Sequence, residues 1–140
     1  MRICIDSCVF IYGAQREKSA ERRLITLIGP TVQLVIPRLV AQEVTRNLRS
    51  TKQVRRFYRL FHELDSASIV DGPVPAEMVA KYISLGLPAK ADAYIGAFAE
   101  WMQVHYVISD NRHFLRELRT HAFEVLDAAA FIARWESDTL

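Results

Sequence analysis

The chain has 140 residues, of which 51% are hydrophobic and 24% are charged, and 18 basic against 16 acidic side chains leave a formal net charge of +2. This length predicts a single domain, residues 1–140, that is large enough to bury a core. No apolar run approaches the roughly 20 residues of a membrane span, and no export signal follows Met1. We therefore expect a cytoplasmic protein without membrane contact. The net charge of +2 is too small to establish a nucleic-acid partner.

Cys4 and Cys8 are the only cysteines of the chain. A zinc site would need more ligands, because the four histidines show no metal-binding spacing with them. We expect both to be buried, reduced thiols, since free cysteine behaves as a small hydrophobic residue.

Short apolar runs alternate with helical patterns along the chain. The predicted strands are residues 2–5, 33–36, 68–70, 104–108 and 123–126. The first strand precedes a helix over 7–18, and Ser19 caps a second that ends before Gly29. Pro37 opens the next helix, and the later ones are predicted at 51–64, 76–85, 89–103, 113–119 and 127–135. This alternation predicts an α/β fold, a three-layer α/β/α sandwich with a mainly parallel, about five-stranded central sheet.

Two carboxylates lie just past predicted strands: Asp6 follows the run 2–5, and Asp110 follows the run 106–109 at the end of the strand predicted at 104–108. Ligands of open α/β sheets bind at the carboxyl ends of the strands, so both acids belong at the binding edge. Glu43 and Asp92 lie on predicted helices that can return to this edge. Four clustered carboxylates favour a hard divalent cation, Mg²⁺ or Mn²⁺, and such an ion suits phosphate chemistry.

Each of these acids also has a plain structural explanation. Asp6 can simply cap the helix that follows it, and Asp110 can end a strand in a turn. Glu43 can be a solvated helical charge, whereas Asp92 lies among small residues where a helix packs closely. Their combination, rather than any one position, indicates a site.

Four sequence blocks carry these acids in order: ICIDSCVFI (3–11), IPRLVAQEV (36–44), ADAYIGAFA (91–99) and VISDNRHF (107–114). Together they resemble the PIN-domain family, especially the VapC-type ribonuclease toxins of type II toxin–antitoxin systems. The resemblance implies an endoribonuclease that hydrolyses RNA phosphodiester bonds with Mg²⁺ or Mn²⁺, commonly a homodimer neutralised by a cognate antitoxin. It implies catalytic and metal-binding roles for Asp6, Glu43, Asp92 and Asp110, with supporting roles for Ser7, Ser109 and Asn111.

Two positions depart from the family pattern. Cys8 stands where the family often has an asparagine, so the orientation of Asp6 is expected to depend on Ser7. The family's last acid aligns with Asn111, while Asp110 stands one place earlier. Either residue can face the metal, and Asp110 is favoured on charge.

A basic face on the helix predicted at 51–64 is a candidate RNA-binding surface. Its cations are Lys52, Arg55, Arg56 and Arg59, opposite an apolar face, and Arg112 lies beside the last acid. Phosphate contacts of this kind would make affinity salt-dependent, although a solvated helix face has the same pattern. The alternative function is a non-catalytic RNA- or protein-binding module of the same fold. Phosphoryl transfer through an aspartyl intermediate is disfavoured, because no second acid occurs at position 8.

Overall fold

Five parallel strands form one central sheet in the computed structural model of the protein, which describes residues 1–87, 90–138 and 140. The strands are β1 (Arg2–Ile5), β2 (Gln33–Pro37), β3 (Ala67–Val70), β4 (Tyr106–Ile108) and β5 (Glu124–Leu126). Their order across the sheet is β3-β2-β1-β4-β5, and every neighbouring pair is parallel. The predicted α/β fold with a five-stranded parallel sheet is confirmed.

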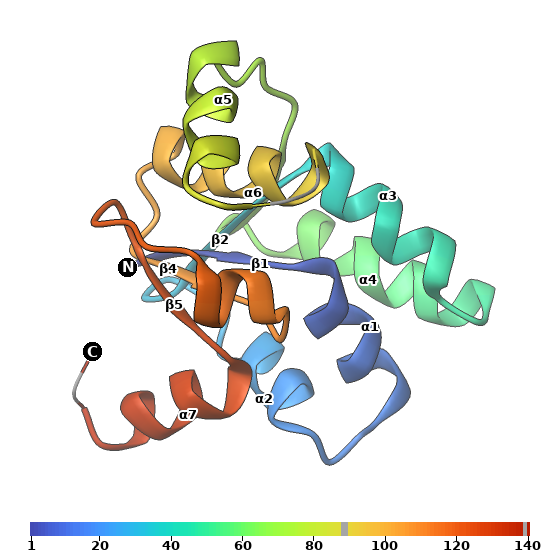
Figure 1. Cartoon of the computed structure of the whole chain (residues 1–140). Helices are drawn as coiled ribbons and strands as arrows, with labels where there is room; N and C mark the ends of the chain where they lie inside the picture. The colour runs from blue at the N-terminus through green and yellow to red at the C-terminus, as the bar shows by residue number, and fades with distance from the viewer. Residues whose placement is uncertain (88–89, 139) are drawn as a thin grey trace.

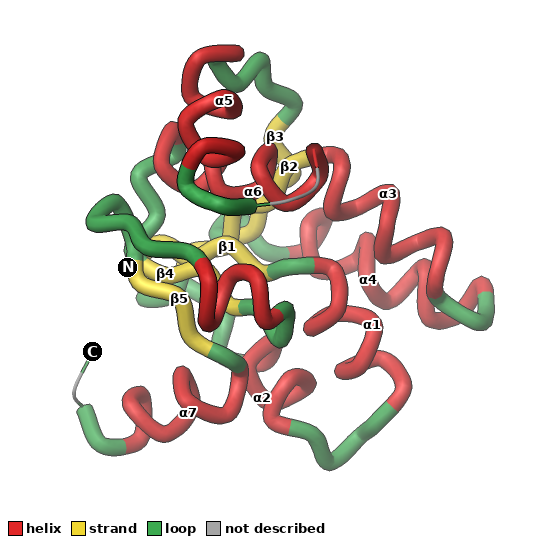
Figure 2. The backbone as a smooth tube through the Cα atoms, in the orientation of Figure 1, coloured by secondary structure: helices red, strands yellow, loops and turns green. Residues whose placement is uncertain are grey.

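Helices cover both faces of the sheet (Figures 1 and 2). They are α1 (Ser7–Gln15), α2 (Ala20–Thr26), α3 (Arg38–Asn47), α4 (Thr51–Glu63), α5 (Ala76–Ser84), α6 (Lys90–Trp101), the short π-helix η1 (His113–Glu117) and α7 (Ala128–Glu136). Helices α1, α2 and α7 pack together on one side, whereas α5 and α6 form a pair on the other. Strands buried on both faces are apolar throughout rather than alternating, which explains why Ile3, Cys4 and Ile5 of β1 are all fully buried.

Local chemistry accounts for several element boundaries. Ser19 caps α2 as predicted, because its side chain accepts a hydrogen bond from the Arg22 backbone N–H. Strand β4 begins two residues later than predicted, since Gln103 has a φ of 54° and the Val104 N–H bonds back to α6. The predicted helix at 113–119 is a five-residue π-helix. The predicted start of the helix at residue 89 lies outside the described residues.

Small residues bring α6 close to α5 and the sheet. Ala93 and Ala97 are fully buried, and a Cβ built on Gly96 would lie 2.7 Å from Cδ1 of Tyr82 on α5. Only a residue without a side chain fits this contact without displacing the ring. The close packing holds α6, and with it the Asp92 side chain in its first turn, beside the sheet.

An aromatic cluster attaches α4 to the rest of the molecule. Phe57, a buried residue of α4, makes edge contacts with Phe10 of α1 and with Tyr58 and Phe61 of its own helix. The opposite face of α4 consequently faces solvent. Across the described part of the chain, no helix is both long and apolar enough to cross a membrane.

Candidate active site

Asp6 lies between the end of β1 and the start of α1, and only 5% of its surface is exposed. Its Oδ1 accepts a hydrogen bond from the Ser7 backbone N–H at 2.8 Å, so it caps α1, which is the structural role that its sequence position left open. Its Oδ2 accepts a second bond, at 2.8 Å, from the hydroxyl of Ser109 at the end of β4. Two neighbouring strand ends therefore hold this carboxylate in one orientation.

The predicted site residues meet at the carboxyl edge of the sheet. A cavity of about 300 Å³ opens there, and its lining residues are Asp6, Ser7, Cys8, Glu43, Asp92, Asp110 and Asn111. Ser109 lies directly behind it, fully buried against Asp6. None of these lining residues is a lysine, an arginine or a histidine, so the protein supplies acids to this pocket without a cationic partner among them. We call this cavity the acidic pocket.

Hydrogen bonds position the two helical acids of the acidic pocket. The Ser7 hydroxyl donates to Oε2 of Glu43 at 2.8 Å, which connects α1 to α3. The Asn111 side-chain amide lies 3.4 Å from both carboxylate oxygens of Asp92 on α6. The acids are thus held apart by short polar side chains rather than by ion pairs.

The pKa of Asp6 is raised above its ordinary value. Burial is the main cause, and the negative charges of Asp92 and Glu43 add to it, while the bonds from Ser109 and Ser7 oppose the shift. A nearby cation would remove the repulsion among the three carboxylates. This is the electrostatic condition under which a divalent ion binds well.

Asp110 and Asn111 are the two candidates for the last metal-facing position, and their side chains face different neighbours. The Asn111 backbone N–H donates to the Ser109 hydroxyl at 3.0 Å and its side chain faces Asp92. Asp110 lines the same pocket, but burial together with Glu21 and Asp127 raises its pKa to about 6, and it hydrogen-bonds Glu21. The amide therefore points to Asp92, while the carboxyl points to α2 and α7.

The two neighbours of Asp110 were not anticipated from the sequence. Glu21 lies in the first turn of α2, and Asp127 caps α7 by accepting a bond from the Ala130 N–H. Acids at these positions are common at helix starts for electrostatic reasons alone. Nothing in the spacing of α2 and α7 along the chain indicates that they meet beside the end of β4.

Cys8 differs from its predicted environment. Cys4 is buried as expected, but Cys8 is half-buried and lines the acidic pocket, with its sulfur 4.0 Å from the Ser109 hydroxyl. Burial and the charge of Asp6 raise the pKa of Cys8 to about 12, so it is a neutral thiol at physiological pH. The prediction of a buried thiol is confirmed for Cys4 and wrong for Cys8.

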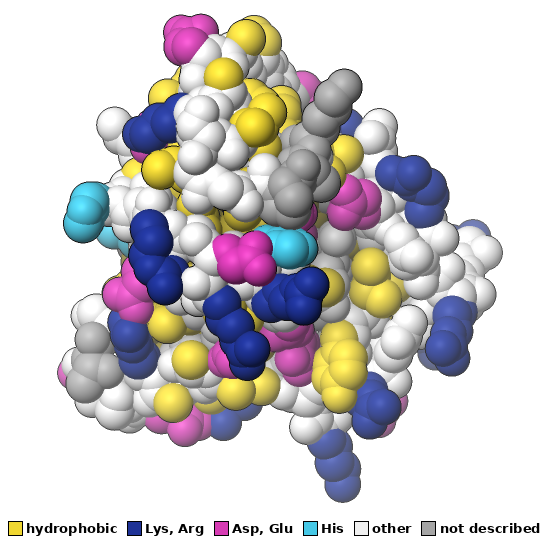
Figure 3. Space-filling model, viewed as in Figure 1, with side chains coloured by type: hydrophobic (Ala, Val, Ile, Leu, Met, Phe, Trp, Pro, Cys, Tyr) yellow, Lys and Arg dark blue, Asp and Glu magenta, His cyan; other side chains and the backbone are white. Residues whose placement is uncertain are grey.

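The predicted RNA-binding residues divide between two places. Lys52, Arg55, Arg56 and Arg59 together line a separate concavity of about 200 Å³ on α4. Arg112 does not line it, because it caps η1 next to the acidic pocket. On the face shown in Figure 3, lysine and arginine side chains are scattered on both sides of the acidic side chains near its centre.

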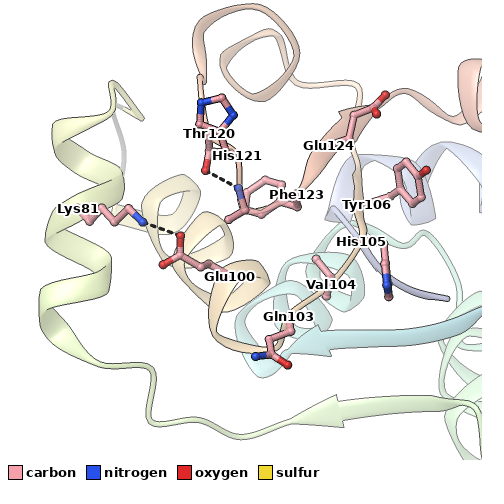
Figure 4. A pocket seen from close by; sticks show the side chains of 11 residues that line it. Lys81, Glu100, Gln103, Val104, His105, Tyr106, Thr120, His121, Phe123 and Glu124 are labelled. Atoms are coloured by element: carbon pink, nitrogen blue, oxygen red, sulfur yellow. Dashed lines mark hydrogen bonds and ion pairs between the residues drawn. The ribbon is translucent and has the colours of Figure 1, made fainter.

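A larger cavity, of about 920 Å³, lies at the opposite, amino edge of the sheet where β4 and β5 begin (Figure 4). Two interactions join groups that line it: Lys81 Nζ lies 2.6 Å from Oε1 of Glu100, and the Ala122 N–H donates to the Thr120 hydroxyl. These groups are already satisfied without a ligand. The chemistry of the strand ends therefore favours the smaller acidic pocket as the site.

Among the residues that the structure describes, no three His, Cys, Asp or Glu side chains converge closely enough to bind one ion directly. The donors of the acidic pocket are nevertheless oxygen atoms, which Mg²⁺ and Mn²⁺ prefer. Mg²⁺ in proteins usually has one or two carboxylate ligands and keeps several waters. The donor set thus fits a largely hydrated ion and does not fit an all-protein metal cage.

Comparison with known proteins agrees with this architecture. The sequence model of the PIN domain matches residues 3–119, whereas no curated protein matches the chain. Among solved structures, a chain of the crystal structure of VapBC2 from Rickettsia felis bound to a DNA fragment from its promoter has the same fold. The TM-score is 0.60 at 16% sequence identity, over 91% of this chain and 98% of that one. With most of its length matched by the family model, the chain belongs to the PIN domain family.

Proposed function

We propose that the protein is a metal-dependent endoribonuclease that hydrolyses RNA phosphodiester bonds in the acidic pocket, within a single nuclease domain of residues 1–140. One observation carries the proposal: a buried carboxylate, Asp6, stands with Glu43 and Asp92 in an open pocket whose described lining contains no cation. Acids that repel one another in a partly desolvated site favour a bound divalent ion.

Mg²⁺ or Mn²⁺ would be held by the site acids Asp6, Glu43, Asp92 and Asp110, of which one or two would be direct ligands while the others would contact waters of the ion. Asn111 is the alternative to Asp110, and its side-chain oxygen would become a ligand only on leaving its hydrogen bond with the His113 N–H. When bound, such an ion lowers the pKa of a coordinated water and stabilises charge on a phosphate group. The chain's own residues supply the orientation. Ser109 and Ser7 fix Asp6, and the Ser7 hydroxyl also fixes Glu43.

Asn111 has two supporting contacts in this proposal. Its Oδ1 accepts a hydrogen bond from the His113 N–H at 3.0 Å, which leaves its amide group to face Asp92. The amide group carries no positive charge, so the negative charge of Asp92 stays available to a cation, which would take over the carboxylate oxygens that the amide faces. His113 itself is engaged with Glu117, and no histidine is required in the proposed reaction.

The physiological role that best fits the family is that of a VapC-type toxin in the cytoplasm. The sequence blocks resemble those toxins, and the structural neighbour is a VapBC2 complex. On this basis we propose an RNA substrate, a cognate antitoxin as protein partner, and a homodimeric toxin. Co-expression with the product of a neighbouring small reading frame, followed by co-purification, tests the antitoxin.

RNA cleavage by the wild type and by Asp6→Asn, with Mn²⁺ and with EDTA, tests the catalytic proposal. We expect cleavage by the wild type only with metal, and a loss of at least 100-fold in Asp6→Asn, a typical cost of removing an essential catalytic group. Asp65→Asn is the matched control, because Asp65 is an exposed carboxyl that does not line the acidic pocket. Undiminished cleavage by Asp6→Asn would refute the assignment.

Metal binding can be measured without catalysis. Mn²⁺ should raise the melting temperature of the wild type and of Asp65→Asn but not that of Asp6→Asn, because an ion that binds only the folded state stabilises it. An equal shift in all three proteins would place the ion elsewhere.

A second candidate function is a non-catalytic RNA- or protein-binding module. Two observations favour it: the Cys8 side chain lines the pocket where the family often has an asparagine, and Asp110 is hydrogen-bonded to Glu21. This candidate requires RNA retention without cleavage and no stabilisation by Mn²⁺. The two experiments above therefore decide between the candidates.

A further inference from the structure

The exposed face of α4 carries four cations at helical spacing. Lys52, Arg55, Arg56 and Arg59 are all exposed, whereas Phe57 on the other side of the helix is buried in the aromatic cluster. Residues three and four positions apart are neighbours on a helix surface, so the four form one continuous stripe. The anchoring of Phe57 determines that this stripe projects into solvent.

The stripe is poorly neutralised by the protein itself. Arg59 lies 3.7 Å from Glu63 one turn further along the helix. Across residues 1–87, 90–138 and 140, no ion pair involves Lys52, Arg55 or Arg56. Like charges at this spacing destabilise a helix by roughly 0.2–0.5 kcal/mol per pair. A bound anion would remove that repulsion.

The four side chains also enclose a concave surface. Its volume is about 200 Å³, and its described lining consists of these four cations alone, without an apolar or acidic residue. Within this concavity a protein segment would find no apolar anchor of the kind that dominates most protein interfaces. Arg56 and Arg59 also border a neighbouring apolar cavity, and the test below therefore includes an acidic polypeptide as a competing ligand. Phosphate groups, in contrast, need only charge and N–H donors, which arginine and lysine supply.

We propose that Lys52, Arg55, Arg56 and Arg59 form a phosphate-binding pocket that holds the RNA backbone outside the acidic pocket. The two pockets share no lining residue, so backbone binding and cleavage are separable functions of the molecule. The identification of the polyanion as RNA rests on the proposed function. Helix α4 begins at Thr51, after its cap Ser50, and the partial positive charge of this helix N-terminus near Lys52 also favours a bound phosphate.

The test is the equilibrium affinity for a labelled single-stranded RNA oligonucleotide, measured by fluorescence anisotropy in EDTA over a range of KCl concentrations. The variant is Lys52→Gln with Arg55→Gln, two exposed residues. Each phosphate contact to a single strand contributes roughly 0.7 to the slope of log K against log salt, so loss of two contacts should reduce the slope by about 1.4. The accompanying loss of affinity at low salt should be about tenfold.

The matched control is Arg16→Gln with Lys18→Gln, which removes the same number of charges from exposed residues between α1 and α2 that, within the described part of the chain, form no ion pair. It should retain most of the affinity and the salt slope. Circular dichroism melts should show the α4 variant to be at least as stable as the wild type, since the substitutions relieve repulsion between like charges.

An unchanged salt slope in the α4 variant would overturn the proposal, as would an equal loss in the control. Equal affinity for poly-glutamate and for RNA would also overturn it, in favour of an acidic protein partner. Wild-type protein that binds RNA through α4 but never cleaves it with Mn²⁺ would refute the proposed nuclease and leave this pocket supported. The two proposals therefore fail separately.

Discussion

Replacement of Asp110 by asparagine should stabilise the metal-free protein at neutral pH. The carboxyl of Asp110 lies beside Glu21, Asp127 and Asp6, and burial with these charges raises its pKa to about 6 from an ordinary value of 3.8. An ionised Asp110 is thus less favourable in the folded chain than in the unfolded one. Asparagine keeps the shape of the side chain, removes the charge and can donate a hydrogen bond to Glu21.

The magnitude follows from the pKa difference. A change from 3.8 to about 6 corresponds to about 3 kcal/mol at full effect. The carboxyl is only partly buried and the residue as a whole is open to solvent, so solvent screening reduces this to about 1 kcal/mol. For a chain of this length that is a rise of about 3 °C in melting temperature.

The pH dependence has a definite sign. Because the folded-state pKa is raised, the folded protein binds more protons than the unfolded chain between pH 3.8 and about 6. The wild type therefore loses stability as the pH rises through this window, and the penalty is absent below it. The free energy of unfolding of Asp110→Asn should exceed that of the wild type by almost nothing at the acidic end of the window. This difference should grow across the window and remain constant above it.

Urea unfolding in EDTA at several pH values, followed by circular dichroism, measures this difference. Asp65→Asn, a change at an exposed acid outside the pocket, serves as the control and should show no such trend. A difference between Asp110→Asn and the wild type that does not vary with pH would refute the reasoning. So would a variant that is less stable than the wild type at neutral pH.

Three further substitutions test the packing around the site. Ser109→Ala should destabilise the protein by about 2 kcal/mol, because it removes the buried donor to Asp6; urea midpoints measure the loss. Gly96→Ala should cost about 1–3 kcal/mol by forcing a methyl group against Tyr82, seen as a lower melting temperature. Phe57→Ala should cost about 3–5 kcal/mol as the centre of the aromatic cluster is lost, again measured in urea.

Each of these substitutions has a control of the same chemistry at a tolerant position. Ser84→Ala removes an exposed hydroxyl that only bonds the Ala80 carbonyl of its own helix. A Cβ at Gly29 would meet nothing closer than the Leu27 carbonyl oxygen at 4.0 Å. Tyr12 is 40% exposed and can be truncated with little loss of burial. Control losses as large as those of the site variants would contradict the packing argument.

Much of the fold could be predicted because its local signals agree with its tertiary structure. Strand β1 was predicted because Ile3, Cys4 and Ile5 form an apolar run, and all three are buried, so the prediction of a strand over Arg2–Ile5 is confirmed. Ser19 could be predicted as the cap of α2 because its hydroxyl accepts a hydrogen bond from a backbone N–H in the first turn of the same helix. The beginning of β4 was misplaced, since the turn at Gln103 has no sequence signal as clear as glycine.

The membership of the acidic pocket could be predicted in outline, whereas its internal geometry could not. Asp6 and Asp110 follow strands, and parallel strands bring their ends to one edge by topology alone. Which way Asp110 and Asn111 point depends on α2 and α7, whose acids Glu21 and Asp127 reach the end of β4 only through packing. The separation of these residues along the chain does not reveal that they lie close together in the folded protein.

The sequence by itself determined the alternation of strands and helices, the acids at the strand ends and the basic stripe of α4, since these depend on residue order and periodicity. Only the tertiary structure decided that Cys8 lines the pocket, that Asn111 faces Asp92, and that the four cations of α4 enclose a concavity separate from the acidic pocket. The physical reason is that burial, hydrogen-bond partners and electrostatic neighbours are properties of contacts between distant segments. Such contacts exist only after the sheet and its two helical layers have assembled.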